Sequence, residues 1–269
     1  MRVLAVVAHP DDETLFLGGV LAGLAASGAE VSVLSATLGE GALWRPEDGE
    51  KGWVRAAEQR SDQWREACAL LGARRTIPLG GAGRWRDYGH VPGPYSPARA
   101  DRAELAGAIR TVAAALDPDI VLTTGDQGIT RHPDHIAVHA AVAACKFPIV
   151  LAACLPIRQV LFAELTLAEA GLAPEPVGLA GGGGFPFAVP LPDAATAAKQ
   201  AACDVYYPGL GTAPLRDLTT TGYGRDVLAL RAIWDETDWT VEWFENHGTR
   251  RGTRLLARWT TAAEIAHAD

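Results

Sequence analysis

The sequence lacks the features by which several classes of protein are recognised. It has no dense run of lysine or arginine, and 24 basic against 32 acidic side chains give a net charge of −8. Nucleic-acid-binding proteins usually carry a basic patch, so that class is disfavoured. Cysteine is scarce, and no CxxC pair is present, which argues against a disulfide framework and against a zinc ribbon. We expect four reduced thiols, at Cys68, Cys145, Cys154 and Cys203.

Long uninterrupted apolar segments are also missing. The apolar run at residues 3–8 is too short for a signal peptide and stops at His9. The longest apolar stretch, residues 136–155, is interrupted by His139, Lys146 and Pro148, which a membrane-spanning helix tolerates poorly. We therefore expect no membrane span and a soluble, cytoplasmic protein. A hydrophobic fraction of 48% over 269 residues is enough for a sizeable core.

The first half of the chain instead shows an alternation of strands and helices. Residues 3–8 are nearly all apolar, as in a parallel strand buried on both faces, and residues 15–26 have helical apolar spacing. The alternation predicts an α/β fold, a Rossmann-like and mainly parallel sheet flanked by helices. Further strands are expected over 31–37 and 119–124, and further helices over 54–71, 100–116 and 136–144.

The second half has weaker patterns, and no composition break separates it from the first. We expect a single domain over residues 1–269, in which residues 1–145 form the Rossmann-like core and residues 146–269 form an elaborated C-terminal half that completes a substrate cleft. The glycines at 181–184 predict a turn, not a phosphate loop, because no Lys-Ser/Thr follows them. We predict strands over 159–166, 185–191 and 239–244, and helices over 193–203 and 224–234.

Two clusters of histidine and aspartate each follow a predicted buried strand. The first is His-Pro-Asp-Asp-Glu at residues 9–13, and the second is His-Pro-Asp-His at residues 132–135. Because ligands bind at the carboxyl ends of parallel strands, we expect the two clusters to meet in space. Imidazole and carboxylate without cysteine suit a metal such as zinc, held by three protein groups with one position left for water.

The spacing within these clusters suggests how the groups divide their tasks. In the first cluster His9 and Asp12 can converge on one ion as the chain turns, and His135 would complete a set of two histidines and one carboxylate. Asp11 would then be free to take a proton from water. A metal-binding protein without turnover and an iron oxygenase with the same three ligands are alternatives, although the intact Asp11 favours an enzyme.

The Ala-His-Pro-Asp-Asp-Glu run at 8–13, together with the His-Pro-Asp-His run, resembles the PIG-L/LmbE-like family of N-acetylglucosamine deacetylases. The resemblance covers about residues 1–145 and implies an LmbE-like fold. Three intermediate segments are also similar to the family, at residues 37–41, 60–72 and 118–121.

The resemblance implies roles for individual residues. His132 would stabilise the oxyanion or protonate the leaving amine, oriented by Asp134, and Arg60 would reach the substrate's sugar or aglycone. Gln63 departs from the glutamate that the family has in this helix, and Tyr206 stands where members often have histidine. The resemblance implies that the zinc ligands are His9, Asp12 and His135. It implies that Asp11 is the general base.

Two long loops, residues 39–52 and 80–97, are expected to roof the site, since loops of this length are usually functional. Glu13 is expected to be a helix-start charge or a partner of the site rather than a ligand. For the single histidines His90, His139 and His247 we expect structural or surface positions. The candidate substrate contacts in the loops are Trp44, Arg84, Trp85, Asp87 and Tyr88.

The predicted function is zinc-dependent hydrolysis of the N-acetyl group of an N-acetylglucosaminyl glycoside or pseudodisaccharide. We expect one Zn²⁺ per chain, with other divalent metals possible, and a small-molecule amino-sugar partner from antibiotic biosynthesis of the aminoglycoside type or from thiol biosynthesis. An amidase that removes a larger acyl group from a mycothiol conjugate or a glycopeptide acyl-sugar is the alternative. The sequence leaves open the aglycone and the oligomeric state.

Overall fold

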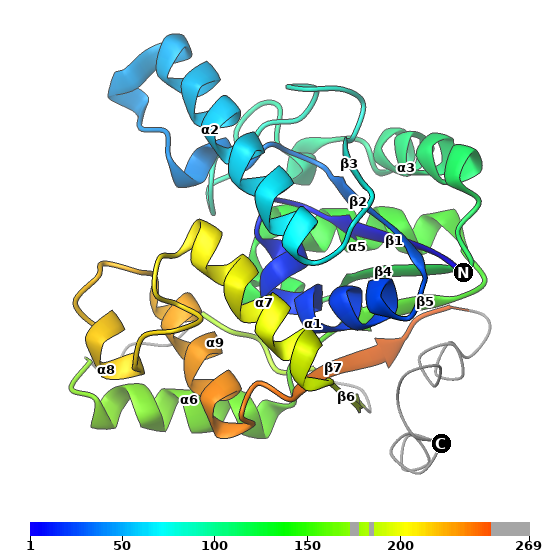
Figure 1. The fold of residues 1–269 in the computed structure, drawn as a ribbon. Coiled ribbons are helices and arrows are strands. Elements are labelled where there is room, and N and C mark those ends of the chain that lie inside the picture. The colour runs from blue at the N-terminus through cyan, green and yellow to red at the C-terminus, as the bar shows by residue number, and fades with distance from the viewer. Residues whose placement is uncertain (173–177, 183–185, 249–269) are drawn as a thin grey trace.

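The computed structural model describes residues 1–172, 178–182 and 186–248. Within these ranges the chain forms a seven-stranded sheet of order β3-β2-β1-β4-β5-β7-β6 (Figure 1). Strands β1 to β5 are parallel, whereas β7 is antiparallel to both of its neighbours. The predicted mainly parallel α/β fold is confirmed. The strands are β1 (Arg2–Val7), β2 (Glu30–Ser35), β3 (Arg75–Pro78), β4 (Ile120–Thr124), β5 (Val150–Ala153), β6 (Phe187–Pro190) and β7 (Val241–Asn246).

Helices cover both faces of this sheet. Alternate residues of β1 enter different cores: Ala5 packs with α1 and α7, whereas Leu4 packs with α3 and α5. This is the expected result of a strand period of two in a strand that is buried on both faces. The helices are α1 (Asp12–Ala26), α2 (Gly49–Leu70), α3 (Arg102–Leu116), α4 (Gly128–Arg131), α5 (Pro133–Cys145), α6 (Ile157–Glu169), α7 (Asp193–Tyr206), α8 (Leu215–Leu218) and α9 (Arg225–Glu236), with 3₁₀ turns η1 (Glu40–Ala42), η2 (Pro46–Asp48) and η3 (Pro97–Arg99).

The prediction of a strand over 159–166 is wrong, because these residues lie in α6. Its buried side chains recur at helical spacing, as at Val160, Ala163 and Leu167, and the helix packs against α9. The short apolar run at 160–163 has no strand period, and length alone could not separate helix from strand. The structure also adds β3, which is only four residues long and was not predicted. Residues 183 and 184 of the glycine turn lie outside the described residues.

A buried ion pair fastens the second half of the chain to the first. Lys199 of α7 donates to Oε1 of Glu242 in β7 at 2.8 Å. The Glu242 carboxylate also accepts the backbone N–H groups of Gly19 and Val20 in α1, both at 2.9 Å. Because β6 and β7 continue the same sheet and α7 packs on α1, we propose that the described residues form one domain.

Replacing Lys199 by methionine should destabilise the protein by about 3–5 kcal/mol, because Glu242 would keep a buried charge without its counter-ion. Urea denaturation monitored by circular dichroism measures the change. Lys51→Met is the matched control, since Lys51 is exposed and its substitution should change the unfolding free energy by less than about 0.5 kcal/mol. Equal midpoints for the two variants would contradict the structural role of this pair.

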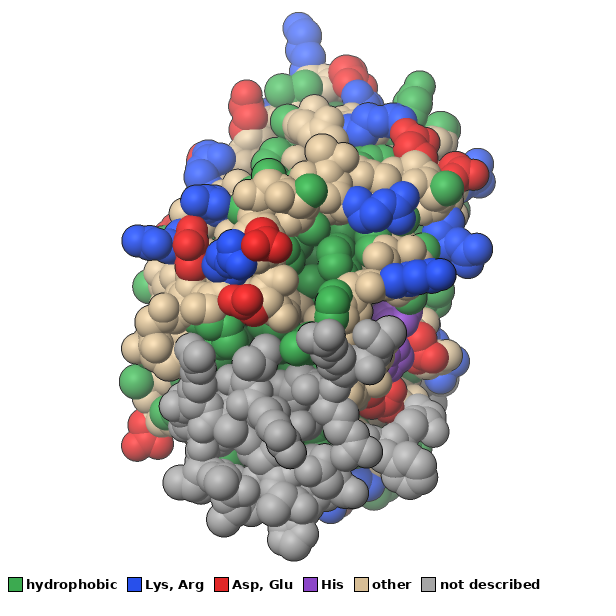
Figure 2. Space-filling model, turned by 90° about the vertical axis from the view of Figure 1, so that its right-hand side faces the viewer, with side chains coloured by type: hydrophobic (Ala, Val, Ile, Leu, Met, Phe, Trp, Pro, Cys, Tyr) green, Lys and Arg blue, Asp and Glu red, His purple; other side chains and the backbone are tan. Residues whose placement is uncertain are grey.

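The helices and the surface charges can be compared with what a membrane-spanning or strongly basic protein would show. None of the helices in the described ranges combines the length and the hydropathy needed to cross a bilayer. Acidic and basic side chains are interspersed over the face that Figure 2 shows, outside the atoms drawn in grey.

Candidate functional site

A cavity of about 210 Å³ lies at the carboxyl ends of β1 and β4. Its lining includes both predicted clusters, the η1 turn and residues of α9. The sheet brings the clusters together because β1 and β4 are neighbouring parallel strands, with Leu4 paired to Val121 and Val6 to Thr123. The position agrees with the general rule for ligand sites in open α/β sheets.

Local hydrogen bonds shape the turn between β1 and α1. The Oδ2 atom of Asp12 accepts the backbone N–H groups of Ala8 at 3.1 Å and His9 at 2.9 Å, so the first residue of α1 folds back over the strand end. Asp11 has a φ of 119°, which L-amino acids rarely adopt. Its backbone N–H donates to Oε2 of Glu13 at 3.0 Å. Backbone strain of this kind often occurs at functional sites.

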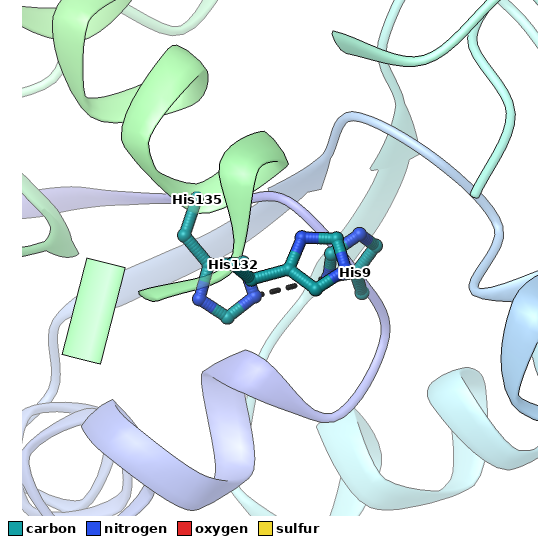
Figure 3. A group of neighbouring side chains, drawn as sticks. All are labelled: His9, His132 and His135. Atoms are coloured by element: carbon teal, nitrogen blue, oxygen red, sulfur yellow. Dashed lines mark hydrogen bonds between the residues drawn. The ribbon is translucent and has the colours of Figure 1, made fainter. Parts of the chain in front are cut away.

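Three side chains converge at the carboxyl end of β1. His9 follows that strand, Asp12 begins α1, and His135 lies in the first turn of α5. Nδ1 of His9 lies 3.0 Å from Nε2 of His135, and Oδ1 of Asp12 lies 3.1 Å from the same Nε2. Oδ2 of Asp12 is 3.8 Å from Nδ1 of His9. Figure 3 shows the rings of His9 and His135 pointing toward one another, with His132 beside them. All three proposed ligands are buried.

The donor chemistry of this group fits a cation. Nδ1 of His135 contacts the carbonyl oxygen of Gly128 at 2.8 Å. A carbonyl only accepts, so Nδ1 carries a proton, and Nε2 can present a lone pair once it gives up its own proton. That lone pair faces the carboxylate of Asp12, which is also an acceptor. Burial acts to raise the pKa of Asp12, but His135 and His9 outweigh it and lower that pKa. Either a proton or a metal ion between Nε2 and Oδ1 satisfies both atoms, so the pair fits a cation.

The other nitrogen of His9 is held by two buried carboxylates. Nε2 lies 3.4 Å from Oδ2 of Asp134 and 3.6 Å from Oδ1 of Asp87. Burial opposes a charged His9 ring, but Asp87, Asp134 and Asp12 outweigh it and raise the pKa of His9 to about 10. The raised pKa means that the ring without an ion carries protons on both nitrogens. An ion that displaced the Nδ1 proton would leave the Nε2 proton shared with these carboxylates, which is the usual way in which a metal-binding imidazole is oriented.

His132 is a neutral hydrogen-bond donor in this arrangement. Its Nδ1 accepts the backbone N–H of Asp134 at 3.2 Å, so the ring proton sits on Nε2. Burial, together with His9, His135 and His90, lowers the pKa of His132 to about 2. The carboxylate of Asp134 faces His9 and accepts the backbone N–H of Ala98 at 2.8 Å. Asp134 therefore contacts His132 through its backbone N–H.

Asp11 is held on one side by two donors. Its Oδ2 accepts from Nη2 of Arg60 at 2.5 Å and from the hydroxyl of Tyr207 at 2.7 Å. Burial raises the pKa of Asp11, while Arg60 and Tyr207 oppose that rise. The guanidinium of Arg60 stacks on the ring of Tyr206, 4.5 Å from its centroid. Arg60 thus contacts Asp11 directly, although the resemblance assigned it to the substrate.

Tyr207 is a contributor that sequence reasoning missed, whereas Tyr206 was noted only as standing where family members often have histidine. Tyr207 lines the cavity, and the hydroxyl of Tyr206 donates to Oε1 of Glu13 at 2.8 Å. Burial raises the pKa of Glu13 to about 7, and the Glu13 side chain accepts the backbone N–H of Asp11. His90 also lines the cavity, with its ring centroid 4.7 Å from that of His132. The position of Tyr207 directly after Tyr206, a few residues beyond the helix predicted over 193–203, was the local signal for it.

The family model described as PIG-L, GlcNAc-PI de-N-acetylase, matches residues 4–146, which is more than half of the chain. The chain belongs to the PIG-L family. Among its relatives, a 1D-myo-inositol 2-acetamido-2-deoxy-alpha-D-glucopyranoside deacetylase of Nakamurella multipartita is 38% identical over 201 residues, 64% of this chain and 66% of the relative. Several further relatives with the same name are covered over about half of their length.

Solved structures support the fold of this PIG-L family chain. The zinc-inhibited form of a teicoplanin deacetylase aligns with a TM-score of 0.59 at 18% identity, covering 91% of this chain and 97% of that one. A 4-carboxy-2-hydroxymuconate hydratase from Pseudomonas putida aligns with a TM-score of 0.55 at 17% identity, covering 91% and 95%. Because a hydratase shares the architecture, the chemistry has to be argued from the site.

The predicted substrate contacts of this PIG-L family member divide into two groups. Asp87 and Arg60 line the cavity. The remaining four lie outside its lining. Trp85 is buried in the core beside α3, because its ring fills space under the loop instead of facing the site. The rings of Trp44 and Tyr88 both pack against the ring of Trp53. The four are Trp44, Arg84, Trp85 and Tyr88.

Proposed function

We propose that this chain is a zinc-dependent deacetylase that hydrolyses the N-acetyl group of an amino-sugar glycoside and releases acetate and a free amine. The observation that carries the proposal is the convergence of His9, Asp12 and His135 on one point beside Asp11. The printed names of the relatives, which are deacetylases of an acetamido-sugar inositol, support the same reaction class.

His9, Asp12 and His135 would hold the metal. When bound, zinc lowers the pKa of its water to about 7 and polarises a carbonyl oxygen. Asp11 takes the proton of the attacking water, because its carboxylate lines the cavity and two donors fix its orientation. After the carbonyl carbon has become tetrahedral, Asp11 returns that proton to the nitrogen of the leaving amine.

His132 stabilises the oxyanion that develops on the acetyl group. Its neutral ring carries the proton on Nε2, and a neutral donor at a buried position can hydrogen-bond a developing negative charge. A ring with so low a pKa is a poor source of a proton for the amine. The resemblance allowed His132 either to stabilise the oxyanion or to protonate the leaving amine. We therefore propose that it stabilises the oxyanion.

A small acyl group fits this site better than a large one. The cavity of about 210 Å³ has room for a compact group, which favours an acetyl group over a longer acyl chain. We also propose a cytoplasmic location, which is supported by four unpaired cysteines, three of them buried. Burial raises the pKa of these thiols, which keeps them protonated and unreactive.

Acetate and amine release from defined substrates tests the proposal. Metal-depleted protein is reloaded with Zn²⁺, Co²⁺, Mn²⁺ or anaerobic Fe²⁺ and given N-acetylglucosaminyl-inositol and N-acetylated aminoglycosides. We expect acetate and free amine in equal amounts, only with metal present. Absence of both products with every metal and substrate would overturn the proposal. Oxygen consumption after the Fe²⁺-loaded protein is transferred to air would point to an oxygenase instead.

A further inference from the structure

The site cavity has an apolar wall beside the metal group. Leu15 and Phe16 contribute to it from α1, one turn after the proposed ligand Asp12, and Leu230 contributes from α9. The ring of Phe16 meets that of His135 edge to face, with 6.0 Å between the two centroids. All three wall residues are buried, and Leu230 is only 1% exposed. We call these three side chains the apolar wall.

A second, smaller cavity adjoins the apolar wall from behind. The three wall side chains line both cavities, so they stand between the two. The back cavity has a volume of about 20 Å³, which is roughly the room that one water-sized group needs. Its lining includes the rings of Trp234 and Trp243. Lys199 and Glu242 also line it, but they are paired with each other at 2.8 Å. An apolar group that passed the wall would therefore meet mainly apolar surface.

The position of the apolar wall suits the acyl chain of the substrate. In the proposed reaction the acyl carbonyl has to reach the metal group and Asp11. The first carbon of the acyl chain is bonded to that carbonyl carbon, so it lies beside the metal group whichever way the sugar points. Much of the remaining lining is polar, as at Asp87, His90 and Asp226, and suits the hydroxyl groups of a sugar. An apolar chain is most stable against the apolar wall.

We propose that the apolar wall sets the length of the acyl group that this protein removes, with Leu230 as the specificity-determining residue. This inference rests on the proposed function, because it assumes that an acyl-amino sugar occupies the site cavity. An acetyl group ends at the wall, whereas a butyryl group has two more carbons and needs the space that Leu230 fills. Shortening Leu230 joins this space to the back cavity, and the longer chain then fits.

Leu230 can be changed without touching the metal group. Leu15 and Phe16 follow Asp12 on α1, and Phe16 also contacts the ring of His135, so substitutions there act on the proposed ligands as well. Leu230 comes from α9, which contributes none of the proposed ligands. A change in acyl preference on substituting Leu230 therefore reports on the wall itself.

Two matched substrates test this assignment, glucosaminyl-inositol that carries either an N-acetyl or an N-butyryl group. Both release the same amine, so one assay measures both. Wild-type protein should have a kcat/KM at least about tenfold higher for the acetyl substrate, because one methylene group in a hydrophobic pocket changes kcat/KM by about 10- to 200-fold. Leu230→Ala should raise the ratio of butyryl to acetyl kcat/KM at least about tenfold. Leu228→Ala is the matched control, a leucine of the same helix that is 2% exposed and lines neither cavity.

A milder variant keeps the test decisive if the alanine variant does not fold, since a buried cavity destabilises the protein. Leu230→Val removes one carbon and should raise the ratio of N-propionyl to N-acetyl kcat/KM severalfold. Ratios that stay at the wild-type value in the folded Leu230 variants overturn the inference. An equal rise in Leu228→Ala, or wild-type protein that cleaves the butyryl substrate as well as the acetyl one, also overturns it.

Calorimetric titration of the zinc-loaded protein with acetate and with butyrate gives a readout that needs no turnover. The affinity for butyrate relative to acetate should rise about tenfold in Leu230→Ala and stay constant in Leu228→Ala. If wild-type protein releases the amine but the Leu230 variants keep its ratios, the inference alone fails. If wild-type protein releases the amine from neither substrate, the proposed function fails, and the titration still decides on the wall.

Discussion

Replacing Asp11 by asparagine should leave the metal bound and lower kcat by about 10²–10⁴, the usual contribution of a general base. Asparagine has the same shape and still offers an oxygen to Arg60 and Tyr207, but it cannot accept the proton of water. The ligands His9 and Asp12 keep their positions, because Asp12 is fixed by backbone N–H groups that the substitution does not touch. KM should change little.

Steady-state acetate release and metal content by mass spectrometry measure this effect together. Asp193→Asn serves as control, because Asp193 is an exposed aspartate at the start of α7, far from the cavity lining. A kcat within about twofold of wild type would remove Asp11 from the role of base. Loss of metal in the variant would show that Asp11 supports the ligands instead.

The two clusters could be predicted because each is a local pattern at a strand end. The parallel arrangement of β1 and β4 then follows from two nearly continuous apolar runs. Because ligands bind at the carboxyl ends of parallel strands, both clusters are expected at the same site. From these steps alone the sequence indicated that His9 and His135 would lie near one another. The family resemblance added the assignment of a reaction, which no spacing rule supplies.

The support of Asp11 could not be predicted in the same way. Tyr207 lies 196 positions further along the chain, and its contact depends on how α7 packs on α1. The position of Trp85 was misjudged for a related reason, since an aromatic residue in a long loop fills a core as readily as it lines a site. Contacts of this kind arise from packing between elements, and a pattern within one segment does not report them.

Replacing His135 by alanine should abolish metal binding, since it removes one of the three groups that would hold the ion. The metal content is expected to fall from about one per chain to nearly zero, and acetate release to the background rate. A ligand that binds only the folded protein stabilises it by about 2.7 kcal/mol at 100 times its Kd. Wild-type protein should therefore gain thermal stability from added Zn²⁺, and His135→Ala should not.

His139→Ala is a closely matched control for His135→Ala. His139 is one turn further along α5, is buried, and contacts the carbonyl oxygen of Thr124 at 2.8 Å, as His135 contacts that of Gly128. Both substitutions thus remove a buried imidazole bonded to a backbone carbonyl, and both should cost folding stability. Only the loss at His135 should also remove the metal and the Zn²⁺-dependent rise in melting temperature. Zinc-dependent stabilisation that persists in His135→Ala would place the ion in another group, which His9 would form with Asp87, His132 and Asp134.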